Sequence, residues 1–218
     1  MEWRAGGLPV STRFDDPYFN IDNGFAETEH VFLEGNRLSD RFCPGFHIAE
    51  LGFGTGLNLL AALLAWRRSG QSGKFRFTTF EAYPMQLDQM TRAHAAFADV
   101  AQVSKEIAEV WPQEETTFET DDVVFTMIVG DVRETLPLWS GRADAWFLDG
   151  FSPAKNPQMW EPEVMKQVFE HTHSGGTAAT YTAAGFVRRG LSDAGFTVTR
   201  HPGYGRKRHM TRAQKGHF

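Results

Sequence analysis

Short apolar segments alternate along the chain with longer amphipathic ones. The short segments are bounded by Gly, Pro or acidic residues, as buried strands are. Strands are predicted at residues 46–49, 75–81, 123–131, 143–149, 177–182, 196–201 and 208–213. Helices are predicted between them, at residues 59–66, 84–112, 161–171 and 186–193. An acidic linker is expected at residues 114–122, and the Gly-Gly pair at 175–176 predicts a turn.

This alternation is typical of one α/β domain with a mostly parallel, seven-stranded sheet and helices on both faces. The last two strands follow each other without a helix, which suits a reversed hairpin at one end of the sheet. The first 45 residues break the pattern, because they are aromatic and acidic, and Pro17 excludes a helix interior there. We therefore expect an extension at residues 1–45, over the cofactor pocket or the sheet edge, and the main domain at 46–218.

A glycine-rich turn lies between the first strand and the first helix. Glu50 leads into Gly52, Gly54 and Gly56, and Asn58 follows in the helix. Glycines let the backbone turn tightly and approach a ligand, and the helix directs its positive end at the same place. The dinucleotide fingerprint needs its third glycine one position later. The pattern resembles instead motif I of S-adenosylmethionine (SAM) methyltransferases, with a turn of another α/β domain as the alternative.

Three later strands each end in an acidic residue. Because the carboxyl ends of parallel strands share one crevice, Glu81, Asp131 and Asp149 are expected near the glycine turn. The Glu81 carboxylate can accept hydrogen bonds from both hydroxyls of a ribose. This use is common to NAD and SAM folds, so it does not distinguish the two cofactors. Asp131 is a candidate for the adenine amino group, or else an N-cap for the helix that follows.

Charge is distributed unevenly along the chain. The net charge is −5, yet residues 181–218 contain eight Lys or Arg and one Asp, which leaves the remainder at −12. A basic end on an acidic body suits a polyanion, although a solvated tail is the alternative. The single cysteine, Cys43, excludes an internal disulfide and a cysteine-based metal cluster, and no metal site is expected. No apolar run predicts a membrane span or signal peptide, so a cytoplasmic protein is expected.

Four stretches carry a more specific signal, at residues 13–36, 49–58, 144–160 and 184–208. The third reads Asp-Ala-Trp-Phe-Leu-Asp-Gly-Phe-Ser-Pro-Ala-Lys-Asn-Pro-Gln-Met-Trp. In this order they resemble the family of methyltransferases that complete 5-methylaminomethyl-2-thiouridine in tRNA, the methyltransferase half of the bifunctional MnmC type. The third stretch is highly specific, whereas the glycine motif is generic.

The resemblance implies a Rossmann-like class I SAM-dependent methyltransferase that acts on the 5-aminomethyl nitrogen of a wobble uridine in tRNA. The fused members also carry a FAD-dependent oxidoreductase domain, which removes the carboxymethyl group beforehand. No second glycine fingerprint is present in this chain, so a stand-alone methyltransferase or a fragment is expected. Another enzyme would then supply the aminomethyl substrate.

Three groups of site residues are expected from the resemblance and, for the basic residues, from charge and position. Asp149 is the candidate for orienting the amine and accepting its proton, with a bond to its own loop as the alternative. Cofactor contacts are expected from Glu50, Gly52, Gly54, Gly56, Asn58, Glu81 and Asp131. Substrate contacts are expected from Tyr18, Phe19, Phe151, Lys155, Arg188, Arg189, Arg206, Lys207 and Arg208. Of these, the aromatic residues are expected to stack on the uracil or to wall the methyl group, with plain packing as the alternative.

Two other functions fit the same residues. One is a SAM enzyme for a small amine, which would neither bind tRNA nor be inhibited by it. The other is a non-enzymatic module that holds SAM or RNA for a partner, for which Asp149→Ala would change nothing. The intact glycine turn and the three strand-end acids argue against a decayed site.

Overall fold

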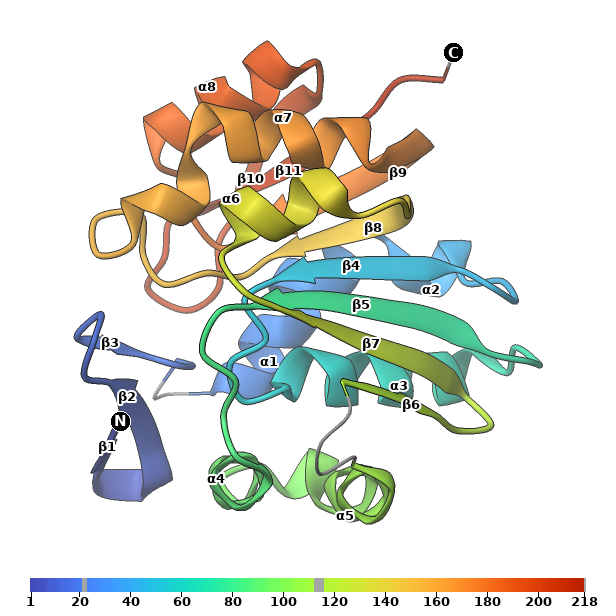
Figure 1. The fold of residues 1–218 in the computed structure, drawn as a ribbon, viewed down its shortest axis with the longest axis vertical. Coiled ribbons are helices and arrows are strands. Elements are labelled where there is room, and N and C mark those ends of the chain that lie inside the picture. The colour runs from blue at the N-terminus through green and yellow to red at the C-terminus, as the bar shows by residue number, and fades with distance from the viewer. Residues whose placement is uncertain (21–22, 112–115, 218) are drawn as a thin grey trace.

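The computed structural model describes residues 1–20, 23–111 and 116–217. Its largest element is a mixed sheet. The strands of this sheet are β4 (His47–Leu51), β5 (Phe75–Glu81), β6 (Thr117–Glu119), β7 (Val123–Val129), β8 (Ala143–Leu148), β9 (Thr172–Thr180), β10 (Thr197–Pro202) and β11 (His209–Gln214). They lie in the order β10-β11-β9-β8-β4-β5-β7-β6, and Figure 1 shows helices on both sides of them.

The predicted α/β class and mostly parallel sheet are confirmed. Strands β4, β5, β7, β8 and β9 are parallel to their neighbours in the centre, and β10 and β11 form the expected antiparallel pair at one end. The eighth strand, β6, pairs antiparallel with β7 at the other edge. It comes from the segment predicted to be an acidic linker, where a strand pattern of only three residues is too short to recognise.

Two helical layers cover the sheet. One layer holds α1 (Gly24–Thr28), α2 (Leu38–Arg41), α3 (Leu57–Ser69), α4 (Leu87–His94) and α5 (Ala101–Val110); the other holds α6 (Val132–Thr135), α7 (Pro162–Glu170) and α8 (Gly185–Ala194). Side chains alternate between the layers along each strand. In β8, Phe147 packs in the core beside α3, while Trp146 packs beside α7.

Two predicted elements differ in detail. The helix expected at 84–112 is two helices, because Phe97 is extended (φ −127°, ψ 104°) and packs on Phe19, with ring centroids 4.9 Å apart. Its predicted end at Pro112 lies outside the described residues. The turn expected at Gly175–Gly176 lies inside β9 as an irregularity, because Ala143 pairs with Thr172 and Ala145 with Thr177.

The N-terminal residues form two separate structures. Strands β1 (Glu2–Arg4), β2 (Leu8–Ser11) and β3 (Asp16–Pro17) make a small antiparallel sheet. Figure 1 shows it beyond the end of the large sheet at which the parallel strands finish. Residues 24–41 instead form α1, a π-helical turn over Glu29–Glu34, and α2, which join the layer of α3.

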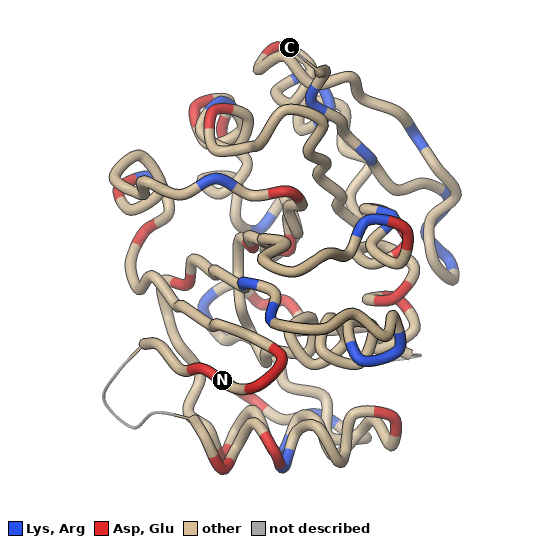
Figure 2. The backbone as a smooth tube through the Cα atoms, turned by 90° about the vertical axis from the view of Figure 1, so that its right-hand side faces the viewer, with Lys and Arg blue, Asp and Glu red and all other residues tan. Residues whose placement is uncertain are grey.

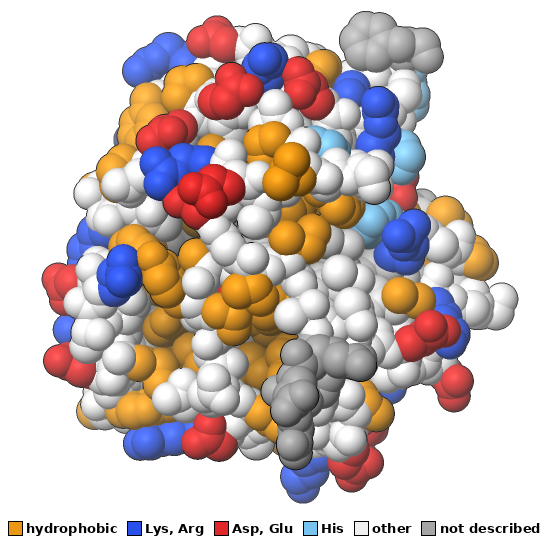
Figure 3. All heavy atoms as spheres, viewed as in Figure 1, with side chains coloured by type: hydrophobic (Ala, Val, Ile, Leu, Met, Phe, Trp, Pro, Cys, Tyr) orange, Lys and Arg blue, Asp and Glu red, His pale blue; other side chains and the backbone are white. Residues whose placement is uncertain are grey.

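The surface is uneven in charge and polarity. Figure 2 shows several Lys and Arg positions along the segments at the upper right, while the remaining basic positions and the acidic ones are spread over the molecule. Figure 3 shows apolar side chains in the middle of one face, where charged side chains lie mainly around the outline. None of the described helices is long and apolar enough to cross a membrane.

Asn36 joins the N-terminal segment to the sheet. Its side chain is fully buried; the amide nitrogen donates to Phe32 O (2.9 Å) and Trp146 O (3.2 Å), and the amide oxygen accepts from Thr177 Oγ1 (2.7 Å). Buried groups without partners are destabilising, so this amide fixes how the segment docks.

We predict that Asn36→Ala lowers the free energy of unfolding by about 2–4 kcal/mol, because each buried group left unpaired costs about 1–3 kcal/mol. Urea unfolding followed by circular dichroism measures it. Gln71→Ala, at an exposed loop position, is the control. Equal unfolding midpoints for the two variants would contradict the role given to Asn36.

Candidate active site

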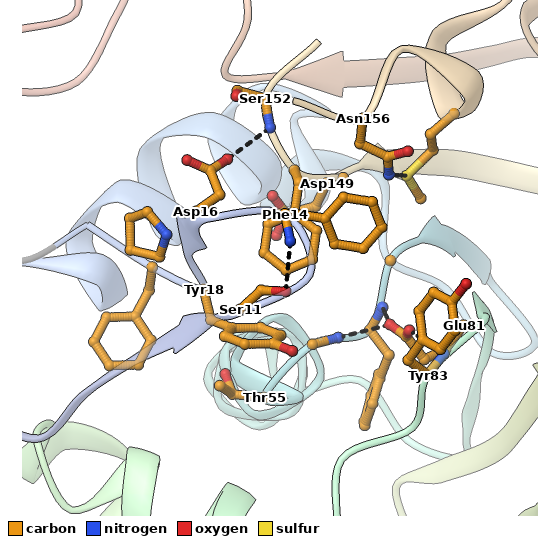
Figure 4. A pocket seen from close by; sticks show the side chains of 18 of the residues that line it. Ser11, Phe14, Asp16, Tyr18, Thr55, Glu81, Tyr83, Asp149, Ser152 and Asn156 are labelled. Atoms are coloured by element: carbon orange, nitrogen blue, oxygen red, sulfur yellow. Dashed lines mark hydrogen bonds between the residues drawn. The ribbon is translucent and has the colours of Figure 1, made fainter. Parts of the chain in front are cut away.

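A cavity of about 1050 Å³ lies where the parallel strands end. Its walls include the glycine turn after β4, the segments that follow β5, β7 and β8, and the small N-terminal sheet on the opposite side. Figure 4 shows side chains from both sides pointing towards one another, with Tyr18 and Phe14 facing Asp149 and Glu81. The position agrees with the rule that α/β sheets bind ligands at the carboxyl ends of their strands.

The glycine turn lets the backbone approach the cavity closely. Gly52 has φ +85°, and an added Cβ would lie 2.4 Å from Asp149 O. Gly54 has φ +55°, and its Cβ would lie 3.1 Å from the Tyr18 ring. A side chain at either position would be strained and would narrow the cavity. Gly56 has φ +78° at the start of α3 but does not line the cavity.

The predicted ribose ligand, Glu81, lies against this turn. Its Oε2 accepts from Phe53 N (3.0 Å) and Gly54 N (3.1 Å), and its Oε1 accepts from Tyr83 N (2.8 Å). Three backbone donors thus hold the carboxylate at the cavity wall. Oε2 already accepts two hydrogen bonds, whereas Oε1 accepts one and keeps capacity for another donor, such as a ribose hydroxyl.

Asp131 caps the helix that follows it and also lines the cavity. Its side chain accepts from Arg133 N (2.9 Å) as the N-cap of α6, and it forms an ion pair with Arg133 (2.6 Å). These bonds lower the pKa of Asp131. The residue also lines the cavity, so capping and contact with a ligand are compatible.

Asn58 is the centre of a buried polar network. Its Nδ2 donates to Glu50 Oε1 (2.9 Å) and to Asp149 Oδ2 (2.7 Å), while its Oδ1 accepts from Thr28 Oγ1 (2.9 Å). Thr79 Oγ1 donates to the other Glu50 oxygen (2.8 Å). Glu50 is fully buried and does not line the cavity, so it supports Asn58 and has no direct access to a ligand there.

Both carboxyl groups of this network are harder to ionise than usual. Burial raises the pKa of Glu50 well above its ordinary value, and Asp149 and Glu81 add to the rise. Burial also raises the pKa of Asp149 to about 7, with Glu27 adding to the rise and Asn58 and Lys207 opposing it. Asp149 therefore exchanges its proton near neutral pH, as a general base requires.

Aromatic side chains from the N-terminal segment and from the loop after β8 form one wall of the cavity. The Phe151 ring stacks on Phe14 (centroids 4.8 Å apart) and meets Tyr18 edge to face (5.1 Å). Both Tyr18 and Phe19 line the cavity, although Phe19 also packs on Phe97. Ser152 N donates to Asp16 Oδ2 (2.8 Å), which ties the loop after β8 to the N-terminal sheet.

The predicted basic residues divide into two groups. Arg206 and Lys207, between β10 and β11, line the cavity. The others, Lys155, Arg188, Arg189 and Arg208, are not in its lining. Lys155 bonds Asp15 and lies 3.6 Å from Asp16, because the loop after β8 faces the N-terminal sheet.

The cavity lining also holds residues that the sequence analysis did not name, and Tyr181 and Glu27 are two of them. Tyr181 directly follows β9, so the rule used for Asp149 could have found it; its hydroxyl donates to Gly150 O (2.7 Å). Glu27 lies on α1, where no local pattern marks a site; its Oε1 accepts from Lys207 Nζ (2.8 Å). Within the described parts of the chain, no cluster of three or more His, Cys, Asp or Glu side chains is arranged to hold a metal.

Comparison with known proteins agrees with this geometry. Residues 94–216 match the model of a family described as S-adenosyl-L-methionine-dependent methyltransferase. The chain is 41% identical, over 97% of its length, to a Hahella chejuensis protein named tRNA 5-methylaminomethyl-2-thiouridine biosynthesis bifunctional protein MnmC, and 43% identical over 98% to the protein of that name from Caulobacter vibrioides. It spans 36% and 37% of these relatives.

A solved structure supports the fold. The crystal structure of MNMC2 from Aquifex aeolicus superposes with a TM-score of 0.77 over 94% of this chain and 66% of that one, at 24% identity. The predicted cofactor also agrees with the site, since the glycine cradle and Glu81 suit an adenosyl group. The chain therefore belongs to the S-adenosyl-L-methionine-dependent methyltransferases, and its predicted resemblance to the MnmC type is confirmed.

Proposed function

We propose that this SAM-dependent methyltransferase converts 5-aminomethyl-2-thiouridine to 5-methylaminomethyl-2-thiouridine at the wobble position of tRNA. The similarity to MnmC proteins over nearly the whole chain carries the proposal, because their name denotes this biosynthesis. The chain spans about a third of those proteins, so the aminomethyl intermediate would come from another active site.

In this proposal residues 1–45 form an extension over the cofactor and substrate cavity, and residues 46–218 carry the methyltransferase fold. Ser11, Phe14 and Tyr18 line the cavity opposite the glycine turn, which supports this division. Gly52, Gly54, Asn58, Glu81 and Asp131 would hold SAM, while Glu50 and Gly56 would support them from outside the lining.

Bound SAM supplies a methyl group on a positively charged sulfur. The protein's own task is to present a neutral amine in line with that methyl group, and such positioning is worth roughly 7–11 kcal/mol. An alkylamine is mostly protonated near neutrality. Asp149, at the end of β8 and with a pKa of about 7, would orient this amine and accept its proton. Asn58 holds the carboxylate in place by its 2.7 Å bond.

The uracil ring would lie against the aromatic wall of Phe14, Tyr18 and Phe151. A wobble base belongs to a single-stranded loop, so it can be turned outward and stacked on aromatic side chains. Arg206, at the cavity rim, would contact the phosphate backbone, with Arg208 nearby in the same loop. Lys155, Arg188 and Arg189 would act only at a distance from the base.

Labelled SAM should transfer its methyl group to tRNA that carries the 5-aminomethyl group, and not to fully modified tRNA. The labelled nucleoside is identified after digestion by chromatography and mass spectrometry. Label in a small amine but not in tRNA, or SAM binding without transfer to any acceptor, would contradict the proposal.

The rate of transfer should rise with pH and level off above about 7, because protonated Asp149 cannot accept a proton. In Asp149→Asn the transfer rate should no longer rise with pH. It should also be about 10²–10⁴-fold lower, since this is the usual contribution of a general base. Glu119→Gln, on the distant edge strand β6, is the control. A wild-type pH profile retained in Asp149→Asn would exclude this role.

The free energy of unfolding gives an independent check of the raised pKa of Asp149. The folded protein keeps the Asp149 proton up to about pH 7, whereas the unfolded chain releases it near the ordinary value of 3.8. The free energy of unfolding should therefore fall as the pH rises between these values, and less so in Asp149→Asn. Urea unfolding at pH 5.0 and 7.5 compares the two proteins.

Arg206→Ala combined with Arg208→Ala should weaken tRNA binding and flatten its dependence on salt. Each phosphate contact that is lost reduces the slope of log K against log salt by about 0.7–0.9. Filter binding from 50 to 300 mM salt measures this slope, with Lys166→Ala on α7 as the control. An unchanged slope in the double variant would exclude phosphate contacts by this loop.

A further inference from the structure

The side chain of Lys207 enters the active-site cavity and ends on a carboxylate. Its Nζ lies 2.8 Å from Glu27 Oε1 and 4.2 Å from the centre of the Tyr181 ring. Glu27, Tyr181 and Lys207 all line the cavity that Asp149 lines, and the Lys207 charge lowers the pKa of Asp149. A primary ammonium group is thus already held beside the candidate base.

The groups that hold this ammonium lie in buried or hydrogen-bonded parts of the fold. Glu27 lies on α1 and is only 8% exposed, and the next residue, Thr28, donates to Asn58 (2.9 Å). Tyr181 follows β9, and its hydroxyl donates to Gly150 O. A buried carboxylate, an aromatic face and a second carboxylate nearby form a site that favours a cation.

Lys207 itself comes from a less constrained element. It lies in the loop between β10 and β11, and its side chain is 43% exposed. In that loop Gly205 has φ +58° and open space around the position of a Cβ. A lysine ammonium on a flexible four-carbon stem exchanges partners readily.

The aminomethyl group of the proposed substrate has the same chemistry. It is a primary ammonium on a carbon stem, which can donate to a carboxylate and lie over an aromatic ring. We propose that Glu27 and Tyr181, next to Asp149, form the binding site for the substrate's aminomethyl group, and that Lys207 fills this site as an internal stand-in until the substrate displaces it. The inference deepens the proposed function and rests on it for the identity of the amine.

This exchange has a consequence for the RNA. A displaced Lys207 is free to pair with a phosphate, as its place in the basic loop predicts from the sequence. The Lys207 ammonium leaves Glu27, and the substrate's ammonium, which has the same charge, takes its place. The buried carboxylate is therefore never left without a partner. A uridine without the amine cannot make this replacement, which gives selectivity for the aminomethyl group.

The test uses methylammonium chloride as the probe, so that it does not depend on tRNA. In Lys207→Ala the site is empty, and methylammonium should raise the melting temperature in a saturable way. The wild type, whose site is filled, should show no such rise. The double variant Lys207→Ala with Glu27→Gln should also show no rise in melting temperature, because it lacks the carboxylate that binds the ammonium group. Lys207→Ser replaces the Ala variant if the latter does not fold.

Two controls separate specific binding from a salt effect. Lys74→Ala removes the partner of an exposed carboxylate, Glu119, far from the cavity, and should not respond. Sodium chloride at equal ionic strength has no N–H donor and should give no saturable rise in the melting temperature of any variant. A rise of equal size in all proteins, or none in Lys207→Ala and Lys207→Ser, would overturn the proposed site.

A second measurement connects the site to tRNA. Glu27→Gln should raise the KM for aminomethyl tRNA about tenfold or more, the effect of a lost charge-assisted hydrogen bond, and leave the Kd for SAM unchanged. An unchanged KM would overturn the role of Glu27 in binding the amine. Methylammonium binding without transfer to tRNA would instead mean that the ammonium site exists and the proposed function is wrong.

Discussion

The side-chain amide of Asn58 is the contact on which the active site depends. It joins Glu50 from β4, Asp149 from the end of β8 and Thr28 from α1, and it stands in the first turn of α3. Four elements that are distant in sequence therefore meet at one buried group. Because an amide has two N–H donors and one oxygen, it can serve both carboxyl groups and the threonine at once. A carboxylate or a hydroxyl in its place could not do so.

The two carboxyl groups that Asn58 binds are weaker acids than usual because they are buried. Burial raises the pKa values of Glu50 and Asp149, and the hydrogen bond that each accepts from Asn58 only partly opposes this rise. Such an arrangement lowers stability at neutral pH. Perturbed groups of this kind cluster where a proton must be moved, and Asp149 faces the cavity whereas Glu50 does not. The two acids thus differ in role although they bind the same amide.

The N-terminal segment changes the shape of the site. A doubly wound sheet alone offers an open crevice at the ends of its strands. Here the small sheet of β1–β3 lies opposite, linked through Asp16 to Ser152 and through the packing of Phe14 on Phe151. The helix α1 brings Glu27 to the same space, where it meets Lys207 from the other end of the chain. Glu27 and Lys207, which are 180 residues apart in sequence, thus complete one cavity.

The core of the fold could be predicted from the sequence alone. Apart from β6, the strands of the large sheet follow from local hydrophobic patterns, and the glycine turn follows from three glycines, which adopt positive φ. The positions of Glu81, Asp131 and Asp149 follow from one rule, that parallel strands end at a common edge. These signals are local, or depend only on strand order, so they can be read without coordinates.

Other features were decided by tertiary structure. Lys155 and Arg208 share the positive charge of Arg206 and Lys207, yet only the latter pair reaches the cavity, since loop conformation directs each side chain. Glu50 was expected to contact the cofactor, but its side chain points at Asn58 behind the wall. Glu27 has no local signal at all. The sequence by itself determined which chemistry is present, and the packing of distant segments decided which side chains face it, because contacts between such segments leave no periodic pattern.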